Sequence, residues 1–123
     1  MNKNKIIKKL SKKYPGKIIV ENKTADQVTE ILCEIAPSIN HPEWSRAIAI
    51  VDSTLPHHHS RIKETYKVIK GELIFHLNSK IKKLKQDDQI VIAPGVVHWA
   101  EGKETWIEVT SKPGWTKADH IPD

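Results

Sequence analysis

Short strand-like segments, each ended by a turn residue, fill most of this sequence and leave few folds open to it. In residues 64–70, Tyr66 and Val68 alternate with Thr65, Lys67 and Ile69, and this period of two is typical of a strand. Gly71 and the pair Pro94-Gly95 are turn signals. Many short strands spaced about 8–12 residues apart predict an all-β antiparallel barrel or sandwich rather than an α/β fold.

The expected strands can be placed by residue number. They cover residues 17–21, 28–35, 46–51, 64–70, 72–77, 80–84, 89–92, 98–100 and 105–110. The length of 28–35 also permits a helix, but its β-branched residues favour a strand. We expect 64–70 and 72–77 to form a hairpin at Gly71, and 98–100 and 105–110 to pair around a loop containing Gly102. The lysines of 80–85 would protect a solvent-exposed edge strand, although a phosphate-binding role is an alternative.

The net charge of +5 comes from the N-terminus, because residues 1–17 contain seven lysines and no acidic residue. We therefore divide the chain into a basic arm, 1–16, and a single β-barrel domain, 17–123. Such an arm could bind nucleic acid or anionic lipid. However, Ile6, Ile7 and Leu10 have helical spacing, which favours a short helix with a solvated lysine face and no nucleic-acid partner. On this interpretation, deleting residues 1–13 should hardly change stability.

Composition indicates a cytoplasmic protein. The single cysteine, Cys33, cannot form an intrachain disulfide and lies in an apolar run, as a buried small hydrophobic residue would. No apolar stretch is long enough to span a membrane, and the N-terminus lacks the apolar core of a signal peptide.

Four residues of metal-ligand type recur at strand-like positions: His57, His59, Glu64 and His98. Residues two apart on a strand share a face, so His57 and His59 can point into the barrel while His58 points away. Imidazole and carboxylate ligands together suit Zn, Mn, Fe, Ni or Cu, whereas Mg or Ca prefers oxygen ligands alone. The sequence therefore predicts one divalent transition metal as cofactor.

These residues also carry a family resemblance. His57-x-His59, Glu64 and Gly71 resemble the first cupin motif, HxH-x4-E-x6-G, and residues 88–98 resemble the second, which ends in a PPG-x-x-H-like turn. Asp87 and Gly102 depart from the usual glycine and asparagine of that second motif, and Ala93 from its first proline. The resemblance implies a small double-stranded antiparallel β-barrel, or jelly roll, with the metal in its mouth.

A weaker resemblance concerns the text ExYxVxxGEL, from Glu64, and the tail SKPGW, from Ser111. Both are similar to small one-domain cupins described as sugar-isomerase-like. The implied function is isomerisation or epimerisation of a sugar or hydroxy acid at the metal. The alternatives are an Fe(II)-dependent dioxygenase and a non-catalytic module that binds a small molecule or a metal.

Further candidates have weaker support. Tyr66 could contact substrate or only fill the barrel, His76 could face the pocket or solvent, and Arg61 could bind an anionic group or be a solvated loop residue. We expect Trp99 and Trp106 to pack in a wall or an interface. His41 and His120 belong to no motif and are expected at the surface. The apolar segments 28–35 and 47–51, together with four tryptophans, suggest a homodimer.

Overall fold

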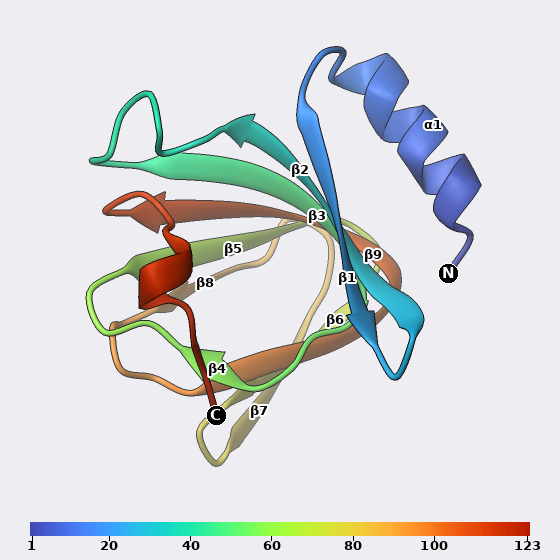
Figure 1. Ribbon diagram of the computed structural model, residues 1–123. Helices are drawn as coiled ribbons and strands as arrows, with labels where there is room; N and C mark the ends of the chain where they lie inside the picture. The colour runs from blue at the N-terminus through green and yellow to red at the C-terminus, as the bar shows by residue number, and fades with distance from the viewer.

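In the computed structural model, which describes residues 1–123, the strands curl into a barrel and a single α-helix packs outside it (Figure 1). The elements in chain order are α1 (Lys3–Lys13), β1 (Ile18–Thr24), β2 (Gln27–Ala36), β3 (Ser45–Ser53), β4 (His57–His58), β5 (Lys63–Lys70), β6 (Leu73–Leu77), β7 (Lys80–Leu84), β8 (Gln89–Ile92), β9 (His98–Lys112), the 3₁₀ turn η1 (Lys117–Asp119) and β10 (Ile121–Pro122). All strand pairs are antiparallel. The predicted all-β barrel with a short N-terminal helix is confirmed.

Strand β9 passes through both halves of the barrel. Its C-terminal half lies between β3 and β5, and its N-terminal half pairs with β6 and β4. The hairpin expected around Gly102 is therefore wrong, because residues 98–112 form one strand. The sequence there forms a bulge instead: Glu104 has a positive φ of 47°, and a Cβ at Gly102 would lie only 2.5 Å from Thr105 Oγ1.

The hairpin expected between residues 64–70 and 72–77 is also wrong. Strand β5 pairs with β8 and β9, whereas β6 pairs with β7 and β9. Gly71, with φ of +94°, lets the chain cross from one half of the barrel to the other. A turn signal between two strands predicts a change of direction, but it does not determine which strands pair.

The barrel interior is filled from alternate positions of the strands. Tyr66 and Val68 of β5 pack there with Phe75 and Ile107 from β6 and β9. The expected edge strand is confirmed, because β7 pairs only with β6 and four of its five residues are exposed. Its lysines stand on the outside of the molecule, away from the interior cluster.

Helix α1 covers the outer face of β2 and β3. Ile6 and Leu10 are 3% and 0% exposed and pack against Ile31, Cys33 and Ile48. The predicted helix with a solvated lysine face is confirmed, but the expectation that residues 1–13 make few buried contacts is wrong. Since β2 and β3 carry apolar residues on both faces, the outer face needs a cover, and the helix provides it. This helix is too short and too polar to cross a membrane.

The same packing removes the argument that led to the homodimer prediction. Segments 28–35 and 47–51 are apolar because they contribute to the barrel interior and to the layer under α1, not because they form an exposed patch. Trp106 also packs against the layer under the helix. The dimer itself stays a prediction.

Candidate metal site

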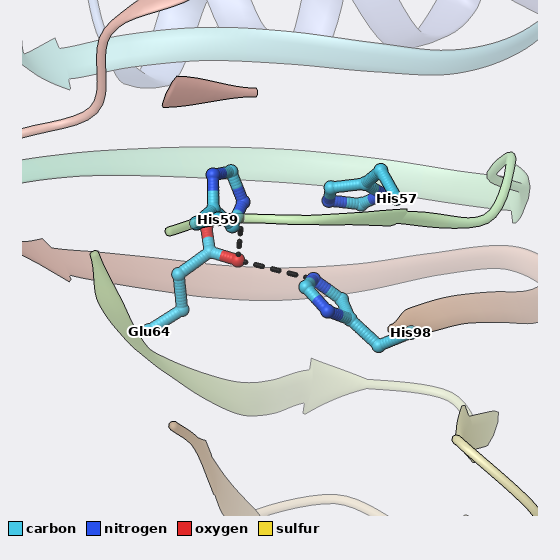
Figure 2. A group of neighbouring side chains, drawn as sticks. All are labelled: His57, His59, Glu64 and His98. Carbon is cyan, nitrogen blue, oxygen red and sulfur yellow. Dashed lines mark hydrogen bonds and ion pairs between the residues drawn. The ribbon is translucent and has the colours of Figure 1, made fainter. Parts of the chain in front are cut away.

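The fold brings the four predicted ligands together. His57 lies on β4 and His59 directly after it, Glu64 lies near the start of β5, and His98 begins β9 (Figure 2). One potential ligand atom from each residue lies within 4.8 Å of those of the other three, and the residues are 8%, 2%, 4% and 1% exposed, respectively. The antiparallel pairing of His57 with His98 and the return of β9 past β5 place these distant residues side by side.

Each of the three histidines is held through Nδ1 by a backbone carbonyl. The partners are Leu55 O at 2.9 Å from His57, Asp119 O at 2.8 Å from His59, and Val96 O at 2.9 Å from His98. Since a carbonyl oxygen only accepts, these contacts place the proton on Nδ1 and leave the Nε2 lone pair free. Carbonyl partners of this kind are typical of imidazoles that bind a metal through the other nitrogen.

Glu64 supplies the negative charge of the cluster. Its Oε1 lies 3.0 Å from His59 Nε2 and 3.2 Å from His98 Nε2 (Figure 2). Burial by itself would raise the pKa of Glu64, but the close contacts and charges of His59 and His98 lower it to about 2. Burial, with the neighbouring His98, lowers the pKa of His57 to about 4. Near neutral pH the cluster therefore contains an ionised carboxylate and a neutral His57, both in ligand form.

A metal ion fits this arrangement. His59 Nε2 is fully buried and has no partner with hydrogen-bond geometry, although a buried polar atom without a partner is costly. Burial would lower the pKa of His59, but the neighbouring Glu64 carboxylate raises it above its ordinary value. Without a metal, a proton on His59 therefore supplies positive charge next to Glu64. Three imidazoles and one carboxylate suit a divalent transition metal and leave coordination positions open in a five- or six-coordinate shell.

The C-terminal segment fixes the loop that joins His59 to Glu64. The Asp119 carboxylate accepts hydrogen bonds from the backbone N–H groups of Ser60, Arg61 and Ile62 at 3.0, 3.0 and 3.1 Å, and from the Ser60 hydroxyl. These bonds outweigh the effect of burial and lower the pKa of Asp119 to about 2. Its own backbone oxygen orients His59, so one residue positions both the ligand and the loop that follows it.

A fourth histidine, His120, lies against the cluster, and the expectation that it is a surface residue is wrong. The ring of His120 stacks on that of His57, with centroids 4.2 Å apart, and lies 5.5 Å from that of His59. Pairing of β10 with β4 brings it there. The sequence gives no signal for this placement, because His120 is separated by more than 60 residues from His57 and His59, the two residues it contacts. His41 instead stacks on Trp44 in another loop.

The structure separates the other candidates. Tyr66 lies in the interior, with its ring 6.1 Å from that of His98. Burial, with Glu64 and Glu30 nearby, raises its pKa well above 10, so its phenol remains protonated. His76 lies on the opposite face of β6 from the buried Phe75, where it stacks on Trp99 and pairs with Glu101. Arg61 is exposed, and only its backbone N–H reaches Asp119.

Glu30 is a further carboxyl group that sequence reasoning missed. It shares a face of β2 with Leu32, which packs against the interior cluster, and its Oε1 accepts a hydrogen bond of 2.8 Å from Asn22. Burial, with a smaller effect from the Glu64 charge, raises its pKa to about 7. Side chains alternate between the two faces of residues 28–35, and Glu30 shares the face of Leu32. The sequence could have placed Glu30 inside the barrel only if it had shown that both faces of this strand are covered.

Comparison with known proteins agrees with this geometry. The family model described as "Cupin domain" matches residues 47–106. No curated protein sequence matches the chain. Similar solved structures include KdgF from Halomonas sp., which is 16% identical, with a TM-score of 0.66 over 76% of this chain and 89% of that chain. Pac13 from Streptomyces, described as a nucleoside dehydratase, is 19% identical, with a TM-score of 0.72 over 89% of this chain and 88% of that chain.

A third similar structure is oxalate decarboxylase from Bacillus subtilis, studied for its Mn(II) centres, at 11% identity and a TM-score of 0.73. The match covers 89% of this chain but only 31% of that longer chain. At such low identities these likenesses show the fold alone. Residues 47–106 of the chain form a cupin domain, and the buried cluster provides a site for one divalent metal ion.

Proposed function

We propose that this protein is a metal-dependent enzyme that isomerises or epimerises a small sugar or hydroxy acid. His57, His59, Glu64 and His98 are the proposed metal ligands. The observation that supports this proposal is their convergence, with each imidazole Nδ1 engaged by a carbonyl and each Nε2 left for the ion. A small cytoplasmic metabolic enzyme also agrees with the one buried free cysteine, Cys33.

The proposed chemistry uses the metal as a Lewis acid. When bound, the ion would polarise the carbonyl or hydroxyl oxygens of the substrate and so acidify the adjacent C–H group. Tyr66 remains a protonated phenol and can donate a hydrogen bond to substrate. Glu30 lies opposite Val51 on the barrel side of β2, and the Glu64 charge contributes to raising its pKa to about 7. It is therefore the candidate to accept the proton, because a base works best when its pKa is near the working pH.

The metal assignment is tested first. Protein purified without an affinity tag should contain one divalent metal per chain, and H57A and H59A should each lose it. H58A is the matched control, because His58 points away from the cluster and pairs with Asp123 at 2.7 Å. Metal retained in H57A and H59A, or lost equally in H58A, would contradict the ligand assignment.

The reaction is tested on the metal-loaded protein with a panel of aldoses, ketoses and α-hydroxy acids in D2O. Isomerisation or epimerisation through proton abstraction should transfer solvent deuterium to the carbon next to the carbonyl, which proton NMR detects. Conversion without deuterium uptake would indicate a hydride shift in place of proton abstraction. No conversion of any panel compound, with or without deuterium uptake and with any metal, would refute the isomerase proposal. Oxygen consumption by the Fe(II) form in that case would indicate the dioxygenase instead.

We also propose a homodimer, now on different grounds. Strand β1 is an edge strand that pairs only with β2, and its Ile18 and Val20 are 61% and 38% exposed. Such an edge is available to pair with a second copy. Light scattering should give twice the chain mass at micromolar concentration, and a monomer mass would refute the proposal.

A further inference from the structure

We propose that His120 is a substrate-binding residue that donates or accepts a hydrogen bond at an oxygen of the metal-bound ligand. This inference rests on the proposed function, because it requires a metal at the four-residue cluster. The ligand class it implies is a small molecule with two neighbouring oxygens, such as a hydroxy-carbonyl compound. One oxygen or both would bind the metal, and one would meet His120.

The position of His120 is built by the C-terminal segment. Strand β10 pairs with β4, with Ile121 opposite His58 and Pro122 opposite His57. Asp119, the residue before His120, is fixed to the 60–62 loop by its carboxylate and to His59 by its backbone oxygen. His120 is therefore held between two anchored neighbours, and its place beside the cluster is not that of a loose terminus.

The ring contacts place His120 against the two ligands of the HxH motif. It stacks on His57 with an angle of 16° between the planes, and it meets His59 edge-on at 74°. On another side Trp115 approaches it, with ring centroids 5.9 Å apart. His120 thus contacts both ligands of the HxH motif and the aromatic side chain of the same C-terminal segment.

One atom of His120 has no partner within the chain. Its Nδ1 is fully buried and makes no hydrogen bond. The other buried side-chain atom without a hydrogen bond is the proposed ligand atom His59 Nε2, whose contact with Glu64 Oε1 at 3.0 Å is an ion pair that lacks hydrogen-bond geometry. Buried polar atoms are nearly always paired, so each exception needs an explanation. The two exceptions lie on neighbouring rings. A metal would satisfy His59 Nε2, and an oxygen of a metal-bound ligand would satisfy His120 Nδ1.

Stacking on His57 would explain an aromatic ring at position 120, but it would not explain the buried Nδ1 of a histidine there. Two substitutions separate these roles. H120F keeps a ring that can stack on His57 and removes the polar atom, whereas H120N removes the ring and can place an amide group near the position of Nδ1. The matched control is H76F, because His76 also stacks on an aromatic ring, Trp99, at 4.4 Å, but on the outer face of the barrel.

The experiment uses Co²⁺-loaded full-length protein and acetohydroxamate, which binds metals through two neighbouring oxygens. Visible absorption of Co²⁺ reports metal binding, and its change on titration gives the dissociation constant of acetohydroxamate. We expect wild type and all three variants to bind one Co²⁺. The dissociation constant should rise at least about tenfold in H120F, as expected for a lost hydrogen bond to a charged ligand, recover most of this loss in H120N, and stay unchanged in H76F.

Each other outcome has a definite meaning. An unchanged dissociation constant in H120F would overturn the inference and leave only a packing role. Loss of Co²⁺ from H120F would overturn it as well, since His120 would then act by holding His57. If wild type binds Co²⁺ but no acetohydroxamate, the inference fails and the metal site stands. If wild type binds no Co²⁺, the proposed function fails with it.

Discussion

Replacing Glu30 with glutamine should make the protein more stable at neutral and basic pH, although Glu30 makes a hydrogen bond. The carboxyl lies on the interior face of β2 and accepts a bond of 2.8 Å from Asn22. Burial, which disfavours the charged form, raises its pKa from an ordinary 4.5 to about 7, and the Glu64 charge adds to this effect. Glutamine has nearly the same shape, keeps the oxygen that Asn22 contacts, and carries no charge.

The size and sign of the effect follow from proton linkage. Because the folded pKa is raised, the folded protein binds a proton that the unfolded chain has released between pH 4.5 and about 7, so stability is lost as pH rises through this window. At about 1.4 kcal/mol per pKa unit, the loss is about 3 kcal/mol at most. About 2.5 kcal/mol of it falls between pH 5 and pH 8. The variant should not show this loss.

Urea denaturation of metal-free wild type and E30Q at pH 5 and pH 8 measures the difference. Other groups titrate in the same range, so the quantity to compare is the change in the gap between the two proteins. We expect the stability of E30Q relative to wild type to increase by about 1–2 kcal/mol from pH 5 to pH 8, because partial solvation of the carboxyl reduces the limiting value. A gap that does not change with pH would show that Glu30 is ionised in the folded protein, and would also remove it as a candidate base.

Three further predictions follow from the packing and the site. L10A should lower the free energy of unfolding by about 3 kcal/mol in urea titration, because Leu10 of α1 is 0% exposed against β2 and β3. Metal content should stay unchanged, because Leu10 belongs to the layer outside the barrel. A change in the free energy of unfolding below about 0.5 kcal/mol would contradict the packing of the helix. Metal affinity, measured by competition with a chelator, should fall from pH 7.5 to pH 5.5, because Glu64 holds the pKa of His59 above 6.5 and a proton then competes for Nε2. An affinity that is flat over this range would argue against His59 as a ligand. D119A should weaken metal binding by about tenfold, as residues that orient ligands do, and an affinity equal to wild type would show that the 60–62 loop holds its shape without the carboxylate.

The strands were predictable from sequence because their evidence is local. Alternation of buried and polar residues in 64–70, and β-branched residues in 28–35, place strands where β5 and β2 lie. The pairing was not predictable from the same evidence. The sequence around Gly71 and around Gly102 predicts a hairpin turn at each. In the structure, the chain crosses between the two halves of the barrel at Gly71, and Gly102 lies at a bulge within β9. A turn residue fixes local backbone geometry, whereas the partner of a strand depends on the whole barrel.

The site divides in the same way. The ligands His57, His59 and Glu64 stand within eight residues of one another, and His98 follows a turn that resembles the second cupin motif, so the resemblance to the family identifies them as a set. His120 and Asp119 belong to no sequence motif, and only the pairing of the two-residue strand β10 with β4 brings them near the cluster. Glu30 was missed for another reason: β2 has apolar residues on both faces, and this conceals the fact that one carboxyl points inward.

The residues that escaped prediction are also those that give the cluster its shape. His59 and Glu64 are separated by a loop, and a loop alone would hold two ligands poorly, since the catalytic or binding geometry must be fixed by the groups around it. Asp119 fixes this loop with bonds to three consecutive backbone N–H groups and aligns His59 with its own carbonyl oxygen. The motif thus specifies the proposed metal ligands, and the C-terminal segment, 60 residues away from His59 in sequence, holds His59 in place and sets His120 beside His57.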